Sequence, residues 1–268
     1  MANPTIPEGH PVPTVQAAAE LMTGAYGDAC REILKGCCFP VFWHEQSEQG
    51  STVLHSGTVT VVRTQTRLFG ITAAHVVSGY INDRLSKNVA LFFYEKQMPG
   101  FQVIDSSDNH PSSRSLDVAT IELDEDELAL IGKPIIPLSF PFGVPEEGRG
   151  IMLAGYPGID RVPTAAFELD FGLFTALGVA RTVTHDQITW AVNREDSAPI
   201  RCNTLPPSHD LGGISGGPLI GWFETPAHIA TYRLCAIISE SRSDIENVVA
   251  KRVDCIDQDG KIHPPGIY

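Results

Sequence analysis

The chain has 268 residues, of which 43% are hydrophobic and 19% are charged, a balance typical of a globular protein with a sizeable core. Its 19 basic and 32 acidic residues give a formal net charge of −13, which repels a phosphate backbone, so nucleic acid is not expected as a partner. No apolar run approaches the length of a membrane span, and the N-terminus has neither the basic start nor the apolar core of a secretory signal.

The cysteines and histidines match no metal-binding pattern. No Cys spacing fits a zinc site, and no pair of histidines fits a motif such as H-E-x-x-H. We therefore expect no metal and no cofactor. The cysteines are predicted to be reduced structural thiols in a cytoplasmic protein, at positions 30, 37, 38, 202, 235 and 255.

The N-terminal region is predicted to contain an arm and a helix. Residues 1–13 hold four prolines and read as an extended arm. Over residues 14–36 apolar side chains recur every three or four positions, which predicts a helix that begins after Thr14 and ends at Gly36.

After Gly36 the pattern changes to short runs rich in Val, Ile, Thr and aromatic residues, separated by turns. This pattern predicts an all-β barrel or sandwich. The acidic stretch 124–127 is expected to be a solvated loop. The predicted strands cover 58–62, 68–72, 89–94, 118–123, 151–155, 179–183, 188–192 and 234–239.

The segment 137–150 has three prolines, three glycines and no periodicity, which indicates a linker between two β halves. The predicted organisation is an arm and helix over 1–36, a first half over 37–136, this linker, and a second half with the C-terminal tail over 151–268.

Three segments together carry the residues of a nucleophilic mechanism. His75 follows small residues at the end of a predicted strand, Asp117 precedes an alternating strand, and Ser215 lies among glycines. Each alone is commonplace, but together they supply a base, a group to orient it and a nucleophile.

These segments resemble the motifs of chymotrypsin-like (trypsin-fold) serine peptidases. The family motifs TAAH, D-[IV]-A and G-x-SGGP correspond here to residues 72–75, 117–119 and 213–218. The resemblance covers roughly residues 40–255 and implies two six-stranded antiparallel β-barrels. Gly155-Tyr156-Pro157-Gly158 also resembles the bacterial glutamyl-endopeptidase and HtrA-like branches.

The resemblance implies a serine endopeptidase that acts on polypeptides. His75 would take the proton of Ser215 and later protonate the leaving amine, while Asp117 would hold the imidazole tautomer. The backbone N–H groups of Gly213 and Ser215 would bind the oxyanion, and glycine at 213 lets the backbone turn toward the substrate.

The same correspondence places substrate-binding residues. The run 234–239 is similar to the strand whose end pairs with extended substrate, so backbone groups of Ser239, Glu240 and Ser241 would bind it. His209 and Asp210 would lie at a polar specificity pocket, unless this segment is only a surface loop. Glutamyl endopeptidases have a histidine where this chain has Ile238, which argues against inheriting their Glu preference.

One departure concerns activation. The family usually has Asp or Asn before the nucleophile, and here that residue is Ile214, which cannot pair with a newly cut N-terminus. We expect activity that does not depend on such processing, with the loop 210–215 either preformed or ordered by a partner. The N-terminal helix either packs behind a barrel or receives a regulatory protein.

Two alternatives remain. Residues 213–217 also satisfy the G-x-S-x-G motif of α/β-hydrolases, but that motif needs a strand before it and a helix after it, and prolines stand at 206, 207 and 218. The other alternative is a non-catalytic peptide-binding module on the chymotrypsin-like fold. Catalytic labelling at Ser215 would separate the enzyme from the module.

Overall fold

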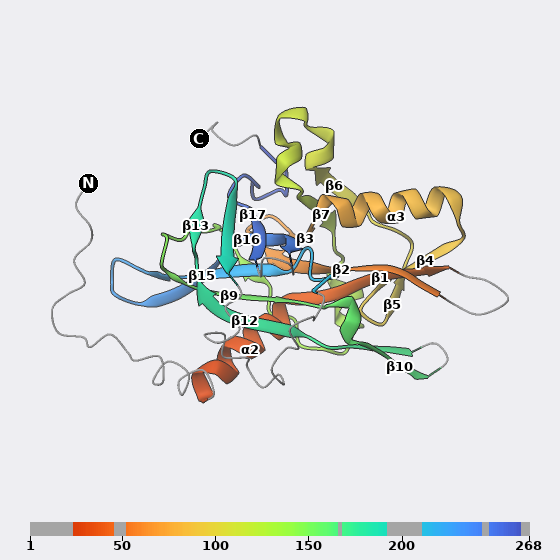
Figure 1. Cartoon of the computed structure of the whole chain (residues 1–268), viewed down its shortest axis with the longest axis horizontal. Helices are drawn as coiled ribbons and strands as arrows, with labels where there is room; N and C mark the ends of the chain where they lie inside the picture. The colour runs from red at the N-terminus through yellow and green to blue at the C-terminus, as the bar shows by residue number, and fades with distance from the viewer. Residues whose placement is uncertain (1–23, 46–51, 166–167, 192–210, 243–246, 264–268) are drawn as a thin grey trace.

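The computed structural model describes residues 24–45, 52–165, 168–191, 211–242 and 247–263 (Figure 1). Within them, most strands belong to two antiparallel sheets, and a separate hairpin is formed by β10 (Arg161–Ala165) and β11 (Glu168–Phe171). The predicted all-β class with two antiparallel halves is confirmed. The described strands divide as eight and seven between the two sheets, rather than six each, because short edge strands extend both sheets.

The first sheet has the strand order β5-β4-β1-β2-β3-β7-β6, and β8 pairs with β2 in parallel. All its other neighbours are antiparallel. The strands are β1 (Cys38–Glu45), β2 (Thr52–Arg63), β3 (Leu68–Thr72), β4 (Val89–Phe93), β5 (Lys96–Met98), β6 (Val103–Ser106), β7 (Ala119–Glu122) and β8 (Leu138–Ser139).

The second sheet has the order β12-β9-β15-β16-β17-β14-β13 and is antiparallel throughout. One expected strand is corrected here: the run 179–183 is interrupted at Ala180 and Arg181, so Val179 ends β12 and Thr182–Val183 form β13. The strands are β9 (Gly150–Gly155), β12 (Phe174–Val179), β13 (Thr182–Val183), β14 (Gln187–Ala191), β15 (Pro218–Glu224), β16 (Ala230–Arg242) and β17 (Asn247–Arg252).

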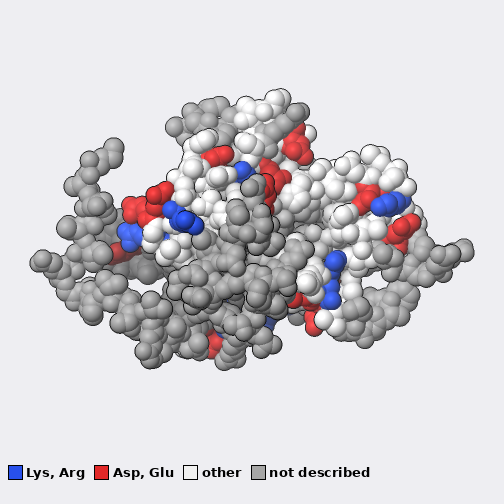
Figure 2. Space-filling model, in the orientation of Figure 1, with Lys and Arg blue, Asp and Glu red and all other residues white. Residues whose placement is uncertain are grey.

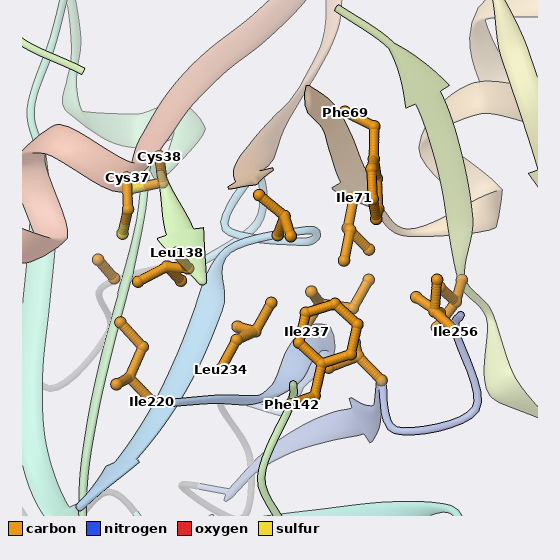
Figure 3. Packing of buried hydrophobic residues seen from close by; sticks show 14 of the residues in the cluster. Cys37, Cys38, Phe69, Ile71, Leu138, Phe142, Ile220, Leu234, Ile237 and Ile256 are labelled. Carbon is orange, nitrogen blue, oxygen red and sulfur yellow. The ribbon is translucent and has the colours of Figure 1, made fainter. Parts of the chain in front are cut away.

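Helix α2 (Ala25–Cys37) lies against both sheets. Its fully buried Leu34 belongs to a core cluster that also contains Leu138 of the first sheet and Met152 of the second. Figure 3 shows this cluster, in which Phe69 and Ile71 of β3 face Ile237 of β16. The helix therefore helps to join the two sheets. The part of the predicted helix before residue 24 lies outside the described residues, and the helix ends at Cys37 rather than at Gly36.

Two further helices correct the sequence prediction. Helix α3 (Ala74–Ser86) follows β3 directly and was not predicted. It buries Val76, Val77 and Tyr80, which recur at helical spacing. The acidic stretch expected as a loop forms α4 (Glu125–Ala129), where Glu125 pairs with Arg63 at 2.7 Å.

The segment 137–150, predicted as a linker, contacts both sheets. Its β8 pairs with β2, and the backbone N–H of Gly143 donates to the carbonyl of Leu234 in β16. Phe142 is buried in the cluster of Figure 3. The segment thus forms part of the core between the sheets.

Five cysteines lie in the described residues, and all are free and buried. Cys202 lies outside them. None of the helices that the structure describes has the length and apolar character needed to span a membrane. On the described part of the face in Figure 2, Lys and Arg lie beside Asp and Glu and form no continuous basic area.

Candidate active site

The first pair of predicted site residues is brought together. Strand β3 ends at Thr72, and His75 is the second residue of α3. Its ring Nδ1 lies 2.8 Å from Oδ2 of Asp117, in the segment before β7. An ionised carboxylate only accepts hydrogen bonds, so Nδ1 carries the proton and Nε2, on the opposite edge of the ring, is left as a base in neutral His75.

The backbone around Asp117 is built to hold this contact. Asp117 has φ +47°, a left-handed conformation that Asp tolerates better than most residues. Its carbonyl accepts from Ala74 N at 3.1 Å, and its Oδ1 accepts from His75 N at 2.9 Å. Asp117 thereby satisfies two free N–H groups at the start of α3, where the helix dipole also favours a negative charge.

The two side chains shift each other's titration. The hydrogen bond to Asp117 raises the pKa of His75 above its usual 6.5, against the opposing effect of burial. Burial alone would raise the pKa of Asp117, but hydrogen bonds from His75 and Ser239 outweigh it and lower that pKa below 3.8. At neutral pH Asp117 is therefore charged and able to stabilise a protonated imidazole.

Ser215 is linked to this pair through Ser239. The Ser215 hydroxyl donates to the backbone carbonyl of Ser239 at 3.2 Å, and the Ser239 hydroxyl donates to Oδ2 of Asp117 at 2.5 Å. Ser239 is buried, at 4% exposure. It therefore contacts two of the three predicted catalytic residues, a side-chain role that the sequence analysis did not anticipate.

The loop before Ser215 needs glycine at position 213. Gly213 has φ +103°, and an added Cβ would lie 2.8 Å from the carbonyl oxygen of Tyr156 and 2.9 Å from the backbone N of Gly158. The carbonyl of Gly212 accepts from Gly158 N. In a trans peptide the next N–H points the opposite way, so the N–H of Gly213 points away from Gly158.

Buried contacts fix the rest of this loop. Ile214 is 1% exposed and packs on Gly155. The contact is so close that a Cβ added to Gly155 would lie 2.6 Å from the Cβ of Ile214. The carbonyl of Ser215 accepts from Thr58 N at 2.8 Å, and that of Gly216 from the Thr60 hydroxyl at 2.8 Å. An apolar side chain at position 214 thus anchors the loop directly before Ser215.

Thr58 is a further residue that sequence reasoning missed. Its buried hydroxyl donates to the Gly213 carbonyl at 3.1 Å and accepts from Tyr156 N at 3.1 Å. It ties β2 of the first sheet to two segments of the second. A threonine within a β-rich run gives no sequence signal for such a role.

The predicted substrate residues fall into two groups. His209 and Asp210 lie outside the described residues. Ser239, Glu240 and Ser241 lie in β16, where β17 pairs with the strand as far as Arg242 but β15 pairs only as far as Ile237. Within the described residues, this end of β16 therefore has a strand on one edge only, although the Ser239 carbonyl already accepts from Ser215.

Among the described residues, no group of three or more His, Cys, Asp or Glu side chains is placed to hold a metal ion. The arrangement offers instead a carboxylate, an imidazole and a hydroxyl, with a fixed glycine-rich loop beside them.

Comparisons with known proteins add a likeness of fold. Neither the protein-family profiles nor the curated proteins contain a match. Among solved structures, a Glu endopeptidase in complex with MPD is 13% identical, with a TM-score of 0.44 over 79% of this chain and 83% of that one. The thermostable serine protease AL20 from an extremophilic microorganism is 15% identical, with a TM-score of 0.44 over 82% and 92% of the two chains.

The protease Anisep from Arthrobacter nicotinovorans is 14% identical, with a TM-score of 0.41 over 81% of this chain and 90% of that one. By name these neighbours are an endopeptidase, a serine protease and a protease, and they do not confirm the expected HtrA-like branch. At such identities, the activity of this chain has to be argued from its own site.

Proposed function

We propose that the chain is a serine endopeptidase that hydrolyses peptide bonds through Ser215, His75 and Asp117. The observation that carries this proposal is the connected set of hydrogen bonds from Ser215 through Ser239 to Asp117 and His75. The motifs around the three residues, read from the sequence, support the same assignment.

The chemistry follows from the properties of these groups. Nε2 of neutral His75 accepts the Ser215 proton as Oγ attacks the carbonyl carbon of the scissile bond. The resulting imidazolium is stabilised by Asp117 and then gives its proton to the leaving amine. Water then takes the place of the amine: His75 accepts a proton from water as its oxygen attacks the acyl carbon, the bond from that carbon to Ser215 Oγ breaks, and His75 returns the proton to Oγ.

The proposal assigns the N–H groups of Gly213 and Ser215 to the oxyanion. The direction of the Gly213 N–H away from Gly158 and the anchoring of Ile214 support a loop that is already formed. Activity should then need no N-terminal processing, and a regulatory protein would act by limiting access rather than by ordering this loop.

One movement is required. The Ser215 hydroxyl donates to the Ser239 carbonyl, whereas catalysis needs it to donate to His75. We propose that rotation about the Cα–Cβ bond of Ser215, which moves Oγ between staggered rotamers, aims the hydroxyl at His75 when substrate binds, since catalytic hydrogen bonds are often not aligned before then.

Covalent labelling tests the proposal. A fluorophosphonate probe should label the wild-type protein at Ser215, and the label should be lost in Ser215→Ala and His75→Ala but kept in the control Ser86→Ala on α3. Cleavage of a peptide library, mapped by mass spectrometry, should show the same dependence. Labelling that persists in Ser215→Ala would overturn the assignment, and a folded wild-type protein that is neither labelled nor active would favour the non-catalytic module.

A further inference from the structure

A groove lies beside the proposed oxyanion loop. It has a volume of about 430 Å³, and its lining includes His55 and Ser56 of β2, Gly158 and Arg161 before and at the start of β10, and Gly212 and Gly213. The lining therefore combines backbone of the proposed oxyanion loop with one cationic side chain.

Arg161 is held in place but has no counter-charge among the residues that the structure describes. Its Nε donates to the Gly158 carbonyl at 2.7 Å, while its buried Nη1 has no hydrogen-bond partner. Within the described residues no carboxylate pairs with it, in contrast to Arg63 with Glu125 and Arg252 with Asp254. A buried polar group without a partner is costly, which points to an acceptor that the described residues do not supply.

Burial lowers the pKa of Arg161, because the buried environment disfavours the charged form. An arginine remains charged at any physiological pH, and its planar guanidinium presents two parallel N–H donors to a carboxylate. An acidic side chain is therefore the ligand that best fits this position.

The position of the groove indicates which part of a substrate would reach it. Two features flank Ser215: the edge of β16 after Ile238, which no described strand covers, and the groove beside Gly213. If the acyl part of a polypeptide pairs with β16, the residues after the scissile bond must leave across the other side, toward β2 and Arg161.

We propose that Arg161 is a specificity-determining residue that binds the carboxylate of an Asp or Glu side chain on the leaving-group side of the scissile bond. This inference rests on the proposed endopeptidase function and adds the substrate class that one of its subsites selects.

Acyl transfer measures this subsite directly. An acyl-enzyme formed from an ester substrate reacts either with water or with an added amine, and the amine occupies the leaving-group side. Glutamate amide should capture the acyl group at least tenfold more efficiently than glutamine amide, which has nearly the same shape but no charge. Equal capture by the two amides in the wild type would overturn the inference.

The same ratio, capture by glutamate amide over capture by glutamine amide, is measured in each variant, because it does not depend on the basal rate of that protein. In Arg161→Gln the ratio should fall to about one, and in Arg161→Lys, which keeps the charge without the planar fork, it should be intermediate. The control Arg149→Gln, an exposed arginine paired with Glu146, should keep the wild-type ratio. An unchanged ratio in Arg161→Gln would also overturn the inference.

Failure of the proposed function has a different signature. If neither ester hydrolysis nor fluorophosphonate labelling occurs, the endopeptidase proposal fails. The charge preference is then read by calorimetry on Ser215→Ala, with two acetylated hexapeptide libraries that have Glu or Gln fixed at the fourth position. Tighter binding of the Glu library that is lost in Ser215→Ala/Arg161→Gln supports the Arg161 site, and equal binding of the two libraries refutes it.

Discussion

The carboxylate of Asp117 contacts His75 at two points, accepting from the backbone N–H at 2.9 Å and lying 2.8 Å from the ring Nδ1. The first contact caps helix α3 and the second orients the imidazole. The same residue therefore fixes both where the helix begins and which ring nitrogen faces outward. Since half of the His75 side chain (52%) is exposed, the opposite edge of the ring is accessible to a substrate.

The pH dependence of activity follows from this pair. Because the hydrogen bond to Asp117 raises the pKa of His75 above 6.5, the neutral base that catalysis needs forms only at higher pH. We expect kcat/KM to rise with pH through a midpoint above 6.5. Asp117→Asn should lower this midpoint and reduce kcat by about 10⁴-fold, since the asparagine side chain can also favour the wrong tautomer.

The midpoint is checked both by a pH–rate profile and by NMR titration of the His75 ring, which does not depend on activity. His110 also contacts an aspartate, Asp105, at 2.8 Å, so His110→Gln is a matched control that should leave the midpoint unchanged. A His75 midpoint that is the same in the wild type and in Asp117→Asn would contradict the expectation.

Removing the Ser239 hydroxyl should weaken both the site and the fold. Ser239→Ala removes the hydroxyl that donates a hydrogen bond to Asp117. It keeps the backbone carbonyl that accepts the hydrogen bond from Ser215. A hydrogen bond to a charged group contributes roughly 1.5–3 kcal/mol, so the free energy of unfolding should fall by about this amount at pH 7. The expected loss in kcat is about tenfold or more.

The pH dependence of that loss has a definite sign. The pKa of Asp117 is lowered in the folded protein, so its charged contacts stabilise the fold above about pH 4 and are lost as the pH falls through the folded-state pKa. The difference between wild type and Ser239→Ala in urea denaturation should therefore shrink at pH 3. Ser86→Ala, on an exposed turn of α3, should show no such difference at either pH.

Gly213→Ala tests whether the loop geometry is required. The added Cβ would meet two backbone atoms within 2.9 Å at φ +103°, so the loop must shift and the proposed oxyanion donor moves with it. We expect a fall in kcat of about 100- to 1000-fold, the usual effect of losing one such donor. Labelling rates with a fluorophosphonate measure the same effect.

Gly132→Ala is the matched control, because Gly132 also has a positive φ, of +70°, but nothing lies within 4 Å of an added Cβ. It should destabilise the fold by about 1 kcal/mol through backbone strain alone and leave the labelling rate unchanged. Equal losses of labelling in the two variants would mean that strain, and not the loop position, is responsible.

Much of the architecture could be predicted from local patterns. Alternation and turn residues predicted both ends of β3, over residues 68–72. They predicted β4 and β9 with an error of one residue at one end of each strand. Helix α3 was not predicted, although Val76, Val77 and Tyr80 recur at helical spacing. The small and apolar residues that end β3 continue through Ala73 and Ala74 to Val76 and Val77, so the start of the helix resembles more of the same strand.

The site was predictable only in part. Short motifs identify residues whose type carries the chemistry, and they pointed to His75 and Asp117, which lie together. They could not identify Thr58, Ser239 as a side-chain donor, or Arg161. Thr58 and Ser239 act through contacts with residues 155 and 122 positions away in the chain, which depend on how the two sheets pack rather than on local sequence. Arg161 contacts the nearby Gly158, and nothing in the local sequence shows that it lines the groove beside Gly213.

Helix α2 provides the last prediction, which concerns its role. Leu34 is fully buried and shares a core cluster with Leu138 of the first sheet and Met152 of the second. Leu34→Ala should therefore lower the free energy of unfolding by about 2–5 kcal/mol, measured by urea denaturation, and both sheets should unfold in one transition. The control Leu85→Ala, at 82% exposure on α3, should change it by less than about 0.5 kcal/mol.

The stability of Leu34→Ala would show whether α2 has a structural role in packing or could instead serve regulation. A loss below about 1 kcal/mol in Leu34→Ala would contradict a structural role. A loss in the expected range would mean that deleting residues 1–35 unfolds the protein and reveals nothing of a regulator. The informative truncation then removes residues 1–23 only, because it keeps Leu34 and its contacts with both sheets, so that a change in the rate of Ser215 labelling would report on the arm itself.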